Sequence, residues 1–254
     1  MTYTGILLAG SRPGGDQFAR QFGTDMKPLI AIAGEPMVRR PARALLASKS
    51  IARVMVLSQA PERMASVIPS NPRVSFRQSS ETIAETMLAL CDDPATAWPL
   101  LVTTADHALL TPKTVDEFCE GAAGADVAIG VVRQSSLLRR LPDSNRTWLK
   151  FRRGAYTGAN LFVLRSPAVR PAIDLWRSVE QDRKKAWRLI ALLGPAVLLG
   201  AVLRLLSIDQ VLNHLGRRFG ITVKAVRLSN PLAGVDVDKP ADHTLVEAIL
   251  AGKA

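Results

Sequence analysis

The sequence predicts a single α/β domain over residues 1–254, in which a mostly parallel, mixed sheet is flanked by helices. Two observations carry this prediction. Short apolar runs alternate along the chain with stretches of helical spacing, which is the pattern of βαβ units. Apolar residues make up 48% of the chain, and a chain of this length can bury a sizeable core.

Six apolar runs are expected to form strands. The first, residues 3–9, reads YTGILLA and leads directly into a glycine-rich loop. The second, residues 51–58, reads IARVMVLS and is rich in the side chains that favour strands. The remaining strands are expected at residues 74–77, 99–103, 126–133 and 161–164.

Helices are expected between these strands, at residues 61–68, 80–90 and 112–122. In the second of them, Ile83, Met87 and Leu90 recur on one face, and Ser80 is the expected N-cap. A further helix is expected to begin near Asp242, where an acidic side chain suits the helix dipole.

Several polar groups fall where the expected strands end. In a parallel sheet, ligands bind beyond the carboxyl ends of the strands. Gly10, residues 79–82 and Asp106 all lie at such ends. The sequence therefore predicts that they line one crevice.

The loop after the first strand suits an anion. Residues 10–15 read GSRPGG, and glycines let backbone N–H groups approach a phosphate closely. Arg12 and Lys27 could neutralise its charge, arginine as a fork and lysine as a point charge. The loop matches neither of the common phosphate-binding glycine motifs, so an ordinary strand–turn–helix connection explains the glycines alone equally well.

Three segments together are similar to the MobA-like nucleotidyltransferase family. They read L-A-G-S-R with K-P-L and G-E-P-M at residues 8–37, V-T-T-A-D-H at 102–107, and V-D-K-P-A-D at 237–242. They occur in the family's order and span most of the chain, although the similarity is weak between residues 133 and 228. The resemblance implies a Rossmann-like, glycosyltransferase-A-type fold, as in nucleotide-diphospho-sugar transferases.

The chain departs from the family in its first loop. The family usually has a second glycine, and often G-T-R, directly after the first. Here Ser11-Arg12-Pro13 follows, and a longer insert separates it from Lys27. Either Arg12 or Arg20 could therefore face the phosphates, and we favour Arg12 because it lies beside Gly10.

The resemblance assigns roles to individual residues. It implies catalytic roles for Arg12, Lys27 and Asp106. The triphosphate would be held by Leu8, Ala9, Gly10, Ser11, Arg12 and Lys27. The base would be read by Gln78, Ser80 and Thr82, although these letters do not identify the base and a plain capped helix explains them nearly as well. The acceptor would be bound by Thr157, Gly158 and Asn160, for which a turn into a strand is the simpler alternative.

Asp106 is the strongest candidate for chemistry. It follows the uncharged residues 100–105, where the chain leaves the core. Nucleotidyl transfer brings one anionic phosphate onto another, and Mg²⁺ or Mn²⁺ can neutralise and bridge the oxygens. The family's metal-binding aspartate falls at this position. The alternative without a ligand is a turn or helix-capping aspartate.

The second carboxylate is expected from residues 234–242. Alternation along V-D-V-D puts Asp236 and Asp238 on the same face of an extended segment. The resemblance points to Asp238 as the second metal ligand, with Asp236 as a neighbour and Asp242 in a structural role. Asp-Val-Asp also has the letters of the glycosyltransferase D-x-D motif, but those enzymes usually carry it mid-chain.

The net charge of +11 suggests phosphorylated small molecules, nucleic acid or an anionic membrane as partners. Aromatic residues make up only 5% of the chain, and no aromatic platform accompanies the scattered basic residues, so we expect no nucleic acid. Cys91 and Cys119 show no C-x-x-C spacing and are expected to be reduced thiols. No secretory signal is visible in the first residues, and a cytoplasmic protein is expected.

The stretch at 183–204 is the most unusual, within a helical, apolar insertion expected at 171–220. Fifteen mostly apolar residues lie between Arg188 and Arg204, and a membrane-spanning helix needs about twenty. One interpretation is a buried helical hairpin or an oligomer contact. The other is a peripheral contact of residues 186–206 with the inner, anionic face of a membrane, with Trp176 and Trp187 at the headgroups.

The sequence thus predicts a magnesium-dependent nucleotidyltransferase. It would move a nucleoside monophosphate from a nucleoside triphosphate to a phosphorylated small molecule or lipid headgroup precursor, with release of pyrophosphate. A glycosyltransferase that uses a nucleotide-sugar is one alternative. A non-catalytic nucleotide-binding or membrane-adaptor protein is the other.

Overall fold

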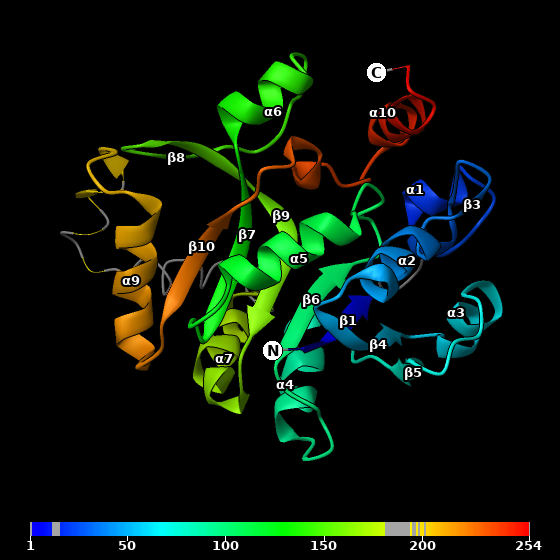
Figure 1. Ribbon diagram of the computed structural model, residues 1–254, viewed down its shortest axis with the longest axis horizontal. Helices are drawn as coiled ribbons and strands as arrows, with labels where there is room; N and C mark the ends of the chain where they lie inside the picture. Colours follow the sequence, from blue (N-terminus) through cyan, green and yellow to red (C-terminus); the bar gives the residue numbers. More distant parts are fainter. Residues whose placement is uncertain are drawn as a thin grey trace.

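The chain forms one α/β domain built on a mixed sheet of eight strands (Figure 1). The computed structural model describes residues 2–11, 16–180 and 202–253, together with 194, 197, 199 and 200. The strands run in the order β10-β7-β9-β6-β1-β4-β5, and β8 pairs with β9. Their bounds are β1 (Tyr3–Leu8), β4 (Ile51–Ser58), β5 (Val74–Gln78), β6 (Leu100–Thr104), β7 (Val127–Arg133), β8 (Leu149–Phe151), β9 (Gly154–Leu164) and β10 (Val223–Arg227).

The helices and short elements lie between these strands. The α-helices are α1 (Gln17–Arg20), α2 (Arg39–Ala47), α3 (Pro61–Val67), α4 (Ile83–Asp92), α5 (Pro112–Gly121), α6 (Gln134–Arg140), α7 (Arg170–Glu180), α9 (Ile208–Phe219) and α10 (Pro240–Leu250). The 3-10 turns are η1 (Lys27–Leu29), η2 (Pro167–Val169) and η4 (Pro231–Gly234). Strands β2 (Ala31–Ile32) and β3 (Glu35–Pro36) form a separate two-stranded ribbon.

Strand direction determines where the site can form. β1 pairs in parallel with β4 and β6, and β4 pairs in parallel with β5. β9 runs antiparallel to both β6 and β7, between which it lies. The carboxyl ends of β1, β4, β5 and β6 therefore meet at one edge of the sheet, as the sequence predicted.

Side chains of the central strands alternate between two apolar layers. Leu7 of β1 belongs to the larger core, which α2 and α5 cover, whereas Ile6 belongs to a second core with α4 and α7. Figure 1 shows α2 and α5 side by side on their face of the sheet. Both Leu7 and Ile6 are fully buried. The period-2 alternation of a strand thus builds cores on both faces, which is why the apolar runs are nearly continuous.

Two local expectations need correction. Thr82, not Ser80, is the N-cap of α4, because its hydroxyl accepts a 3.2 Å hydrogen bond from the N–H of Glu85. The strand expected at 161–164 is the end of the much longer β9. β9 contains a bulge near Asn160, which has a φ of +47°. The strand therefore continues through a segment whose glycines and asparagine resemble a turn in the sequence.

The region expected as an insertion contributes α7 and α9. A small apolar cluster joins Ile208 of α9 to Val131, Tyr156 and Ala225 of the sheet. Residues 181–193, which include Trp187, lie outside the described residues. Within the described ranges, no helix is long and apolar enough to cross a bilayer. Both cysteines are free thiols, and burial raises the pKa of Cys119 to about 12.

Candidate nucleotide-binding site

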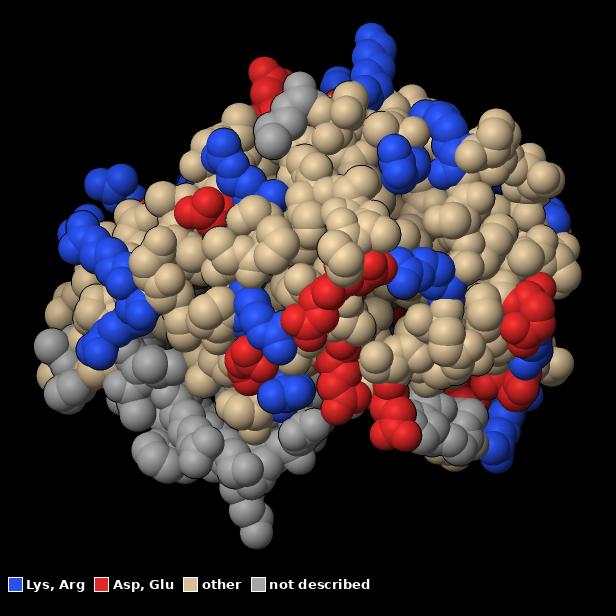
Figure 2. Space-filling view, turned by 90° about the horizontal axis from the view of Figure 1, so that it is seen from below, with Lys and Arg blue, Asp and Glu red and all other residues tan. Residues whose placement is uncertain are grey.

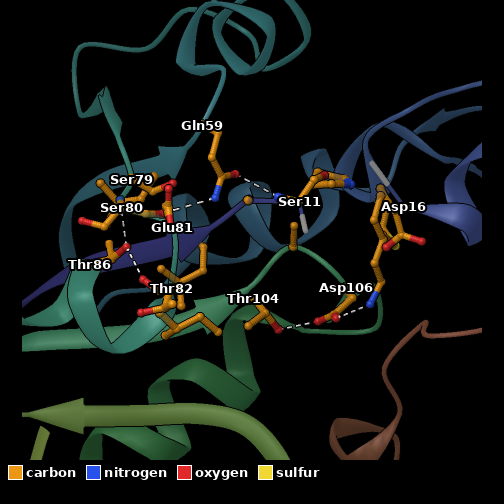
Figure 3. Close-up of a pocket in the computed structure, with 18 of the residues that line it drawn as sticks. Ser11, Asp16, Gln59, Ser79, Ser80, Glu81, Thr82, Thr86, Thr104 and Asp106 are labelled. Atoms are coloured by element: carbon orange, nitrogen blue, oxygen red, sulfur yellow. Dashed lines mark hydrogen bonds and ion pairs between the residues drawn. The ribbon is translucent and has the colours of Figure 1, made fainter. Parts of the chain in front are cut away.

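A cavity of about 900 Å³ opens at the carboxyl ends of β1, β4, β5 and β6. Ligand pockets typically fall between about 300 and 1,000 Å³, so this one has room for a nucleotide. Figure 3 shows residues 79–82 at one end and Asp16 and Asp106 at the other, with Gln59 and Thr104 between them. The described lining residues are Leu8, Gly10, Ser11, Asp16, Gln17, Phe18, Lys27, Pro28, Met37, Leu57, Gln59, Ser79, Ser80, Glu81, Thr82, Ile83, Thr86, Thr104, Ala105, Asp106 and Asp238.

Lys27 lies between two carboxylates at one end of this cavity. Its Nζ is 2.6 Å from Oδ2 of Asp106 and 2.5 Å from Oδ1 of Asp238. These three residues are far apart in the sequence, yet the ammonium group of Lys27 contacts both carboxylates. The arrangement brings together the lysine and the two aspartates that the sequence singled out.

Local structure fixes each of the three side chains. Lys27 is the first residue of η1. Asp106 follows β6, and the Thr104 hydroxyl donates a hydrogen bond to its carboxylate. The N–H of Val237 donates to the carbonyl of Asp106 at 3.1 Å, which joins the segment before α10 directly to the end of β6.

The charge balance at this point favours a protonated lysine. Burial lowers the pKa of Lys27, but the negative charges of Asp106 and Asp238 and their hydrogen bonds outweigh it. The pKa of Lys27 is therefore raised above its ordinary value. At neutral pH the ammonium offsets one of the two negative charges, so the group of three carries a net charge of about −1.

His107 next to Asp106 takes no part in this group. It is fully buried, and burial lowers its pKa to about 4. The imidazole is therefore neutral at physiological pH, with Nδ1 3.4 Å from the Thr103 hydroxyl.

Gly10 and Gln59 shape the loop side of the cavity. The side-chain oxygen of Gln59 accepts a 2.9 Å hydrogen bond from the N–H of Ser11. A Cβ atom at Gly10 would lie 2.8 Å from that oxygen, so any larger residue would push the glutamine away. Gln59 was not among the expected site residues, although it follows β4 directly and the rule about carboxyl ends of strands points to it.

The far end of the cavity is lined by Ser79, Ser80 and Thr82. The hydroxyl oxygens of Ser11 and Ser79 are buried and have no hydrogen-bond partner among the described residues. Buried hydroxyls are normally paired, so these two are candidates to bind a ligand. Ser80 is held by its backbone N–H, which donates to the Thr86 hydroxyl at 3.1 Å.

Some expected residues are not among the described residues that line the cavity. Arg12 falls outside the described residues, and Arg20 on α1 is not among the described residues that line the cavity. Ala9 is buried in the core. Gln78 lies outside the lining, and its side-chain amide donates to the carbonyl of Gln59 at 3.1 Å.

A second cavity of about 270 Å³ shares Asp238 with the first. Its lining is strongly polar and includes the expected acceptor residues Thr157 and Gly158. The described residues around it are Asn145, Arg146, Thr147, Thr157, Gly158, Gly234, Asp236, Asp238, Lys239 and Asp242. Asn160 is not in the lining, but its amide donates to the Asp236 carboxylate at 3.1 Å.

Asp236 and Asp238 have different partners. Val235 and Val237 are buried, so the two aspartates alternate with them toward the surface. Asp238 contacts Lys27, whereas Asp236 forms an ion pair with Arg146. No feature of the sequence connects Arg146 to Asp236, which lies 90 residues further along the chain.

The two carboxylates beside Lys27 are suitable ligands for a hard divalent cation. Asp106 and Asp238 can both contact one cation, and carboxylate oxygens are ligands that Mg²⁺ prefers. Among the described residues, no group of three or more His, Cys, Asp and Glu side chains forms a candidate metal site. Mg²⁺ is commonly held by one or two carboxylates, with water and phosphate oxygens completing its shell.

The candidate site thus combines a strand-end cavity, a lysine and two carboxylates. Residues 5–206 match the family model of the MobA-like NTP transferase domain. The chain therefore belongs to the MobA-like NTP transferase family.

Solved structures support the fold. A hypothetical transferase from Thermus thermophilus is 29% identical, with a TM-score of 0.79, over 96% of this chain and 100% of the other. The 4-diphosphocytidyl-2C-methyl-D-erythritol synthase of Anaerococcus prevotii is 9% identical, with a TM-score of 0.62, over 98% and 96%. A CMP:2-keto-3-deoxy-manno-octonic acid synthetase complexed with CTP is 14% identical, with a TM-score of 0.58, over the full length of both chains. No curated protein matches the sequence.

Proposed function

We propose that the protein is a magnesium-dependent nucleotidyltransferase that moves a nucleoside monophosphate from a nucleoside triphosphate to a phosphorylated acceptor. One observation carries the proposal. Lys27, Asp106 and Asp238 converge at one end of a 900 Å³ cavity whose other end presents Ser79, Ser80 and Thr82. Membership of the MobA-like NTP transferase family supports the same class of reaction.

The roles follow from the chemistry of the side chains. Lys27, the backbone at Gly10 and Ser11, and Arg12 hold the triphosphate. Asp106 and Asp238 hold Mg²⁺ or Mn²⁺, which when bound neutralises charge on the phosphate oxygens. The hydroxyls of Ser11 and Ser79, which have no partner in the described part of the chain, supply hydrogen bonds to the nucleotide, with Ser79 nearer the base.

The reaction needs no general base from the chain. An acceptor phosphate oxygen is already ionised, and it forms a bond to the α-phosphorus as the bond to the bridging β-phosphate oxygen breaks. Pyrophosphate leaves with the electrons of that bond. The residues of the site contribute position and charge stabilisation, which supply most of the rate enhancement in phosphoryl-type transfers.

The second cavity is the proposed acceptor site. It meets the first at Asp238, so an acceptor bound there lies beside the proposed metal and the α-phosphorus. Thr157 and Gly158 line it, and Asn160 supports it through Asp236. Its polar lining suits the polar body of a phosphorylated small molecule or a lipid headgroup precursor.

The first test is a nucleotide screen followed by product analysis. CTP heads the screen of the four triphosphates with Mg²⁺ because one structure above was solved with CTP. A triphosphate that binds the folded protein raises its melting temperature by mass action. We then expect pyrophosphate release when that triphosphate is combined with a panel of phosphorylated acceptors.

The products separate the alternatives. A glycosyltransferase would take a nucleotide-sugar and release a nucleoside diphosphate or monophosphate instead of pyrophosphate. A binding protein would show the thermal shift but no turnover with any acceptor. Pyrophosphate together with a nucleotide-linked acceptor is the result that the proposal requires.

A peripheral contact with an anionic membrane is a further part of the proposal. Leu199, Val202, Leu203 and Leu205, which lie close to Arg204 in the sequence, are 57–69% exposed. The N–H of Arg152 donates to the carbonyl of Leu206 at 3.0 Å, so the β8–β9 turn brings further positive charge beside them. On the face seen in Figure 2, other basic side chains are scattered among acidic ones. Apolar side chains beside arginines suit an anionic lipid surface.

Vesicle flotation tests this contact. The protein should float with vesicles that contain phosphatidylglycerol and stay behind with neutral phosphatidylcholine vesicles. The double variant Val202→Ser, Leu203→Ser should float less, because the exposed apolar area is reduced while the charge is unchanged. Absence of flotation on anionic vesicles would remove the membrane contact and leave the nucleotidyltransferase proposal in place.

A further inference from the structure

Arg146 connects the two acidic residues that flank Asp238 along the chain. Its Nη1 pairs with the carboxylate of Asp236, and its Nη2 lies 2.8 Å from the carbonyl oxygen of the same residue. The same Nη2 is 3.2 Å from Oδ1 of Asp242. The Arg146 side chain is 13% exposed, so these contacts are largely shielded from water. One guanidinium therefore contacts three acceptors on a short stretch of chain.

Two sets of contacts connect the Arg146 guanidinium to the backbone around Asp238. On the N-terminal side, Arg146 holds both the side chain and the carbonyl of Asp236, two residues before Asp238. On the C-terminal side, it holds one carboxylate oxygen of Asp242. The other oxygen of Asp242 accepts from the backbone N–H of Asp238 at 3.1 Å and of Lys239 at 3.2 Å. The backbone is thus fixed on both sides of Asp238.

The segment needs such support because no regular structure holds it. Residues 235–238 belong to neither a helix nor a strand. The 3.1 Å hydrogen bond from the N–H of Val237 to the carbonyl of Asp106 links their backbone to the end of β6. The Asp238 side chain itself is 62% exposed and contacts Lys27. An exposed side chain on an irregular segment keeps a fixed position only if its backbone is fixed.

Asn160 completes the arrangement on the sheet side. It adopts a φ of +47° at the bulge in β9, a backbone conformation that costs free energy for most residues and that asparagine tolerates. Its amide donates to the second oxygen of Asp236 at 3.1 Å. Both oxygens of Asp236 are therefore engaged by protein donors, which leaves Asp236 a poor candidate for a metal ligand.

We propose that Arg146 is a positioning residue that fixes the Asp238 carboxylate for the divalent cation of the proposed reaction. The inference rests on the proposed function, since it assigns Arg146 a purpose only if Asp238 binds the cation. Hydrogen-bonded partners behind a ligating carboxylate commonly account for 10- to 100-fold in metal affinity. Arg146 acts on the cation in this way, through Asp236 and Asp242.

Arg146→Lys is the principal test. Lysine keeps the positive charge but lacks the planar fork that reaches three acceptors at once. Binding of Mn²⁺ is titrated by electron paramagnetic resonance in the presence of the triphosphate selected by the nucleotide screen. We expect the variant to bind Mn²⁺ at least about 10-fold more weakly than the wild type. Its kcat should fall while its KM for the triphosphate stays the same, because Arg146 does not line the nucleotide cavity.

The control is Arg170→Lys. Arg170 pairs with Asp92 in an exposed ion pair of the same residue types, away from both cavities. This variant should bind Mn²⁺ as the wild type does. A folded Arg146→Lys protein with wild-type Mn²⁺ affinity would overturn the inference.

A second variant keeps the inference testable if Arg146→Lys does not fold. In Asp242→Asn, the amide oxygen can still accept from Asp238 and Lys239, but the amide nitrogen faces Arg146 and breaks that contact. Mn²⁺ affinity should fall here too, and an unchanged affinity would contradict the inference. A wild-type protein that binds no Mn²⁺ with any triphosphate would overturn the proposed function, and the role of Arg146 with it.

Discussion

Asp106→Asn should lower the rate of pyrophosphate release by about 1,000-fold while leaving the protein folded. The substitution removes one of two carboxylates proposed to hold the cation, and such a cation contributes several kcal/mol to transition-state stabilisation. Each 1.36 kcal/mol corresponds to a factor of about ten in rate. The measurement is kcat with saturating triphosphate and acceptor, beside a thermal melt that reports folding.

Asp92→Asn is the matched control. Asp92 is an exposed aspartate at the end of α4 that pairs with Arg170 and lines neither cavity. Its substitution should leave kcat unchanged. An Asp106→Asn protein with near wild-type kcat would mean that this carboxylate holds no essential cation, and the proposed mechanism would be wrong.

Lys27→Gln should reduce turnover by at least about 100-fold, because the site loses the point charge that it directs at the triphosphate. The same change should have an opposite effect on metal binding without nucleotide. In the wild type, the Lys27 ammonium lies where both carboxylates can reach it, so a free divalent cation must compete with it. We expect the nucleotide-free variant to bind Mn²⁺ more tightly than the nucleotide-free wild type.

The free energy of unfolding provides an independent measure of the effect of Lys27→Gln. Without the ammonium, Asp106 and Asp238 face each other uncompensated. We expect this to cost about 1–2 kcal/mol in the free energy of unfolding, less than for a fully buried pair because Asp238 is 62% exposed. Binding of Mn²⁺ should restore the lost stability. Lys113→Gln, at an exposed lysine of α5, should change neither stability nor Mn²⁺ binding.

The pH dependence of the wild type should report the same contact. The pKa of Lys27 is raised in the folded state, so its ion pairs stabilise the protein fully below the unfolded-state pKa near 10.5. This contribution should be lost as pH rises through the folded-state pKa. Lys27→Gln should lack that part of the alkaline loss of stability. Equal alkaline profiles for wild type and variant would contradict the ion-pair arrangement.

The sequence was sufficient for most of the parallel part of the fold, although β10, which pairs in parallel with β7, was not expected. The apolar runs that became β1, β4, β5, β6 and β7 are continuous and bounded by turn residues, and their order implied a shared carboxyl edge. The long β9 was largely missed, because the glycines and asparagine that permit its bulge resemble a turn. Ser80 and Thr82 are both good caps, and only the actual start of α4 decides between them.

Whether a site residue could be predicted from the sequence depended on whether it lies in a local motif or acts through a contact that is distant in the chain. Lys27, Asp106 and Asp238 stand in the short motifs on which the family resemblance rests, and the fold brings them together. Gln59 acts through a backbone contact 48 residues away in the chain. Arg146 acts through an ion pair with Asp236 across 90 residues. The ion pair of Arg146 leaves no local pattern and needed the three-dimensional arrangement, whereas the position of Gln59 directly after β4 already places it at the carboxyl edge of the sheet.

The most direct measurement is a crystal structure of the protein with Mn²⁺ and a non-hydrolysable form of the triphosphate that it binds best. The anomalous signal of manganese locates the cation independently of the rest of the map. We predict one manganese peak in contact with Asp106, Asp238 and the phosphates, with Lys27 turned from the carboxylates toward the phosphates. A triphosphate bound outside the 900 Å³ cavity, or manganese that contacts neither aspartate, would contradict the account.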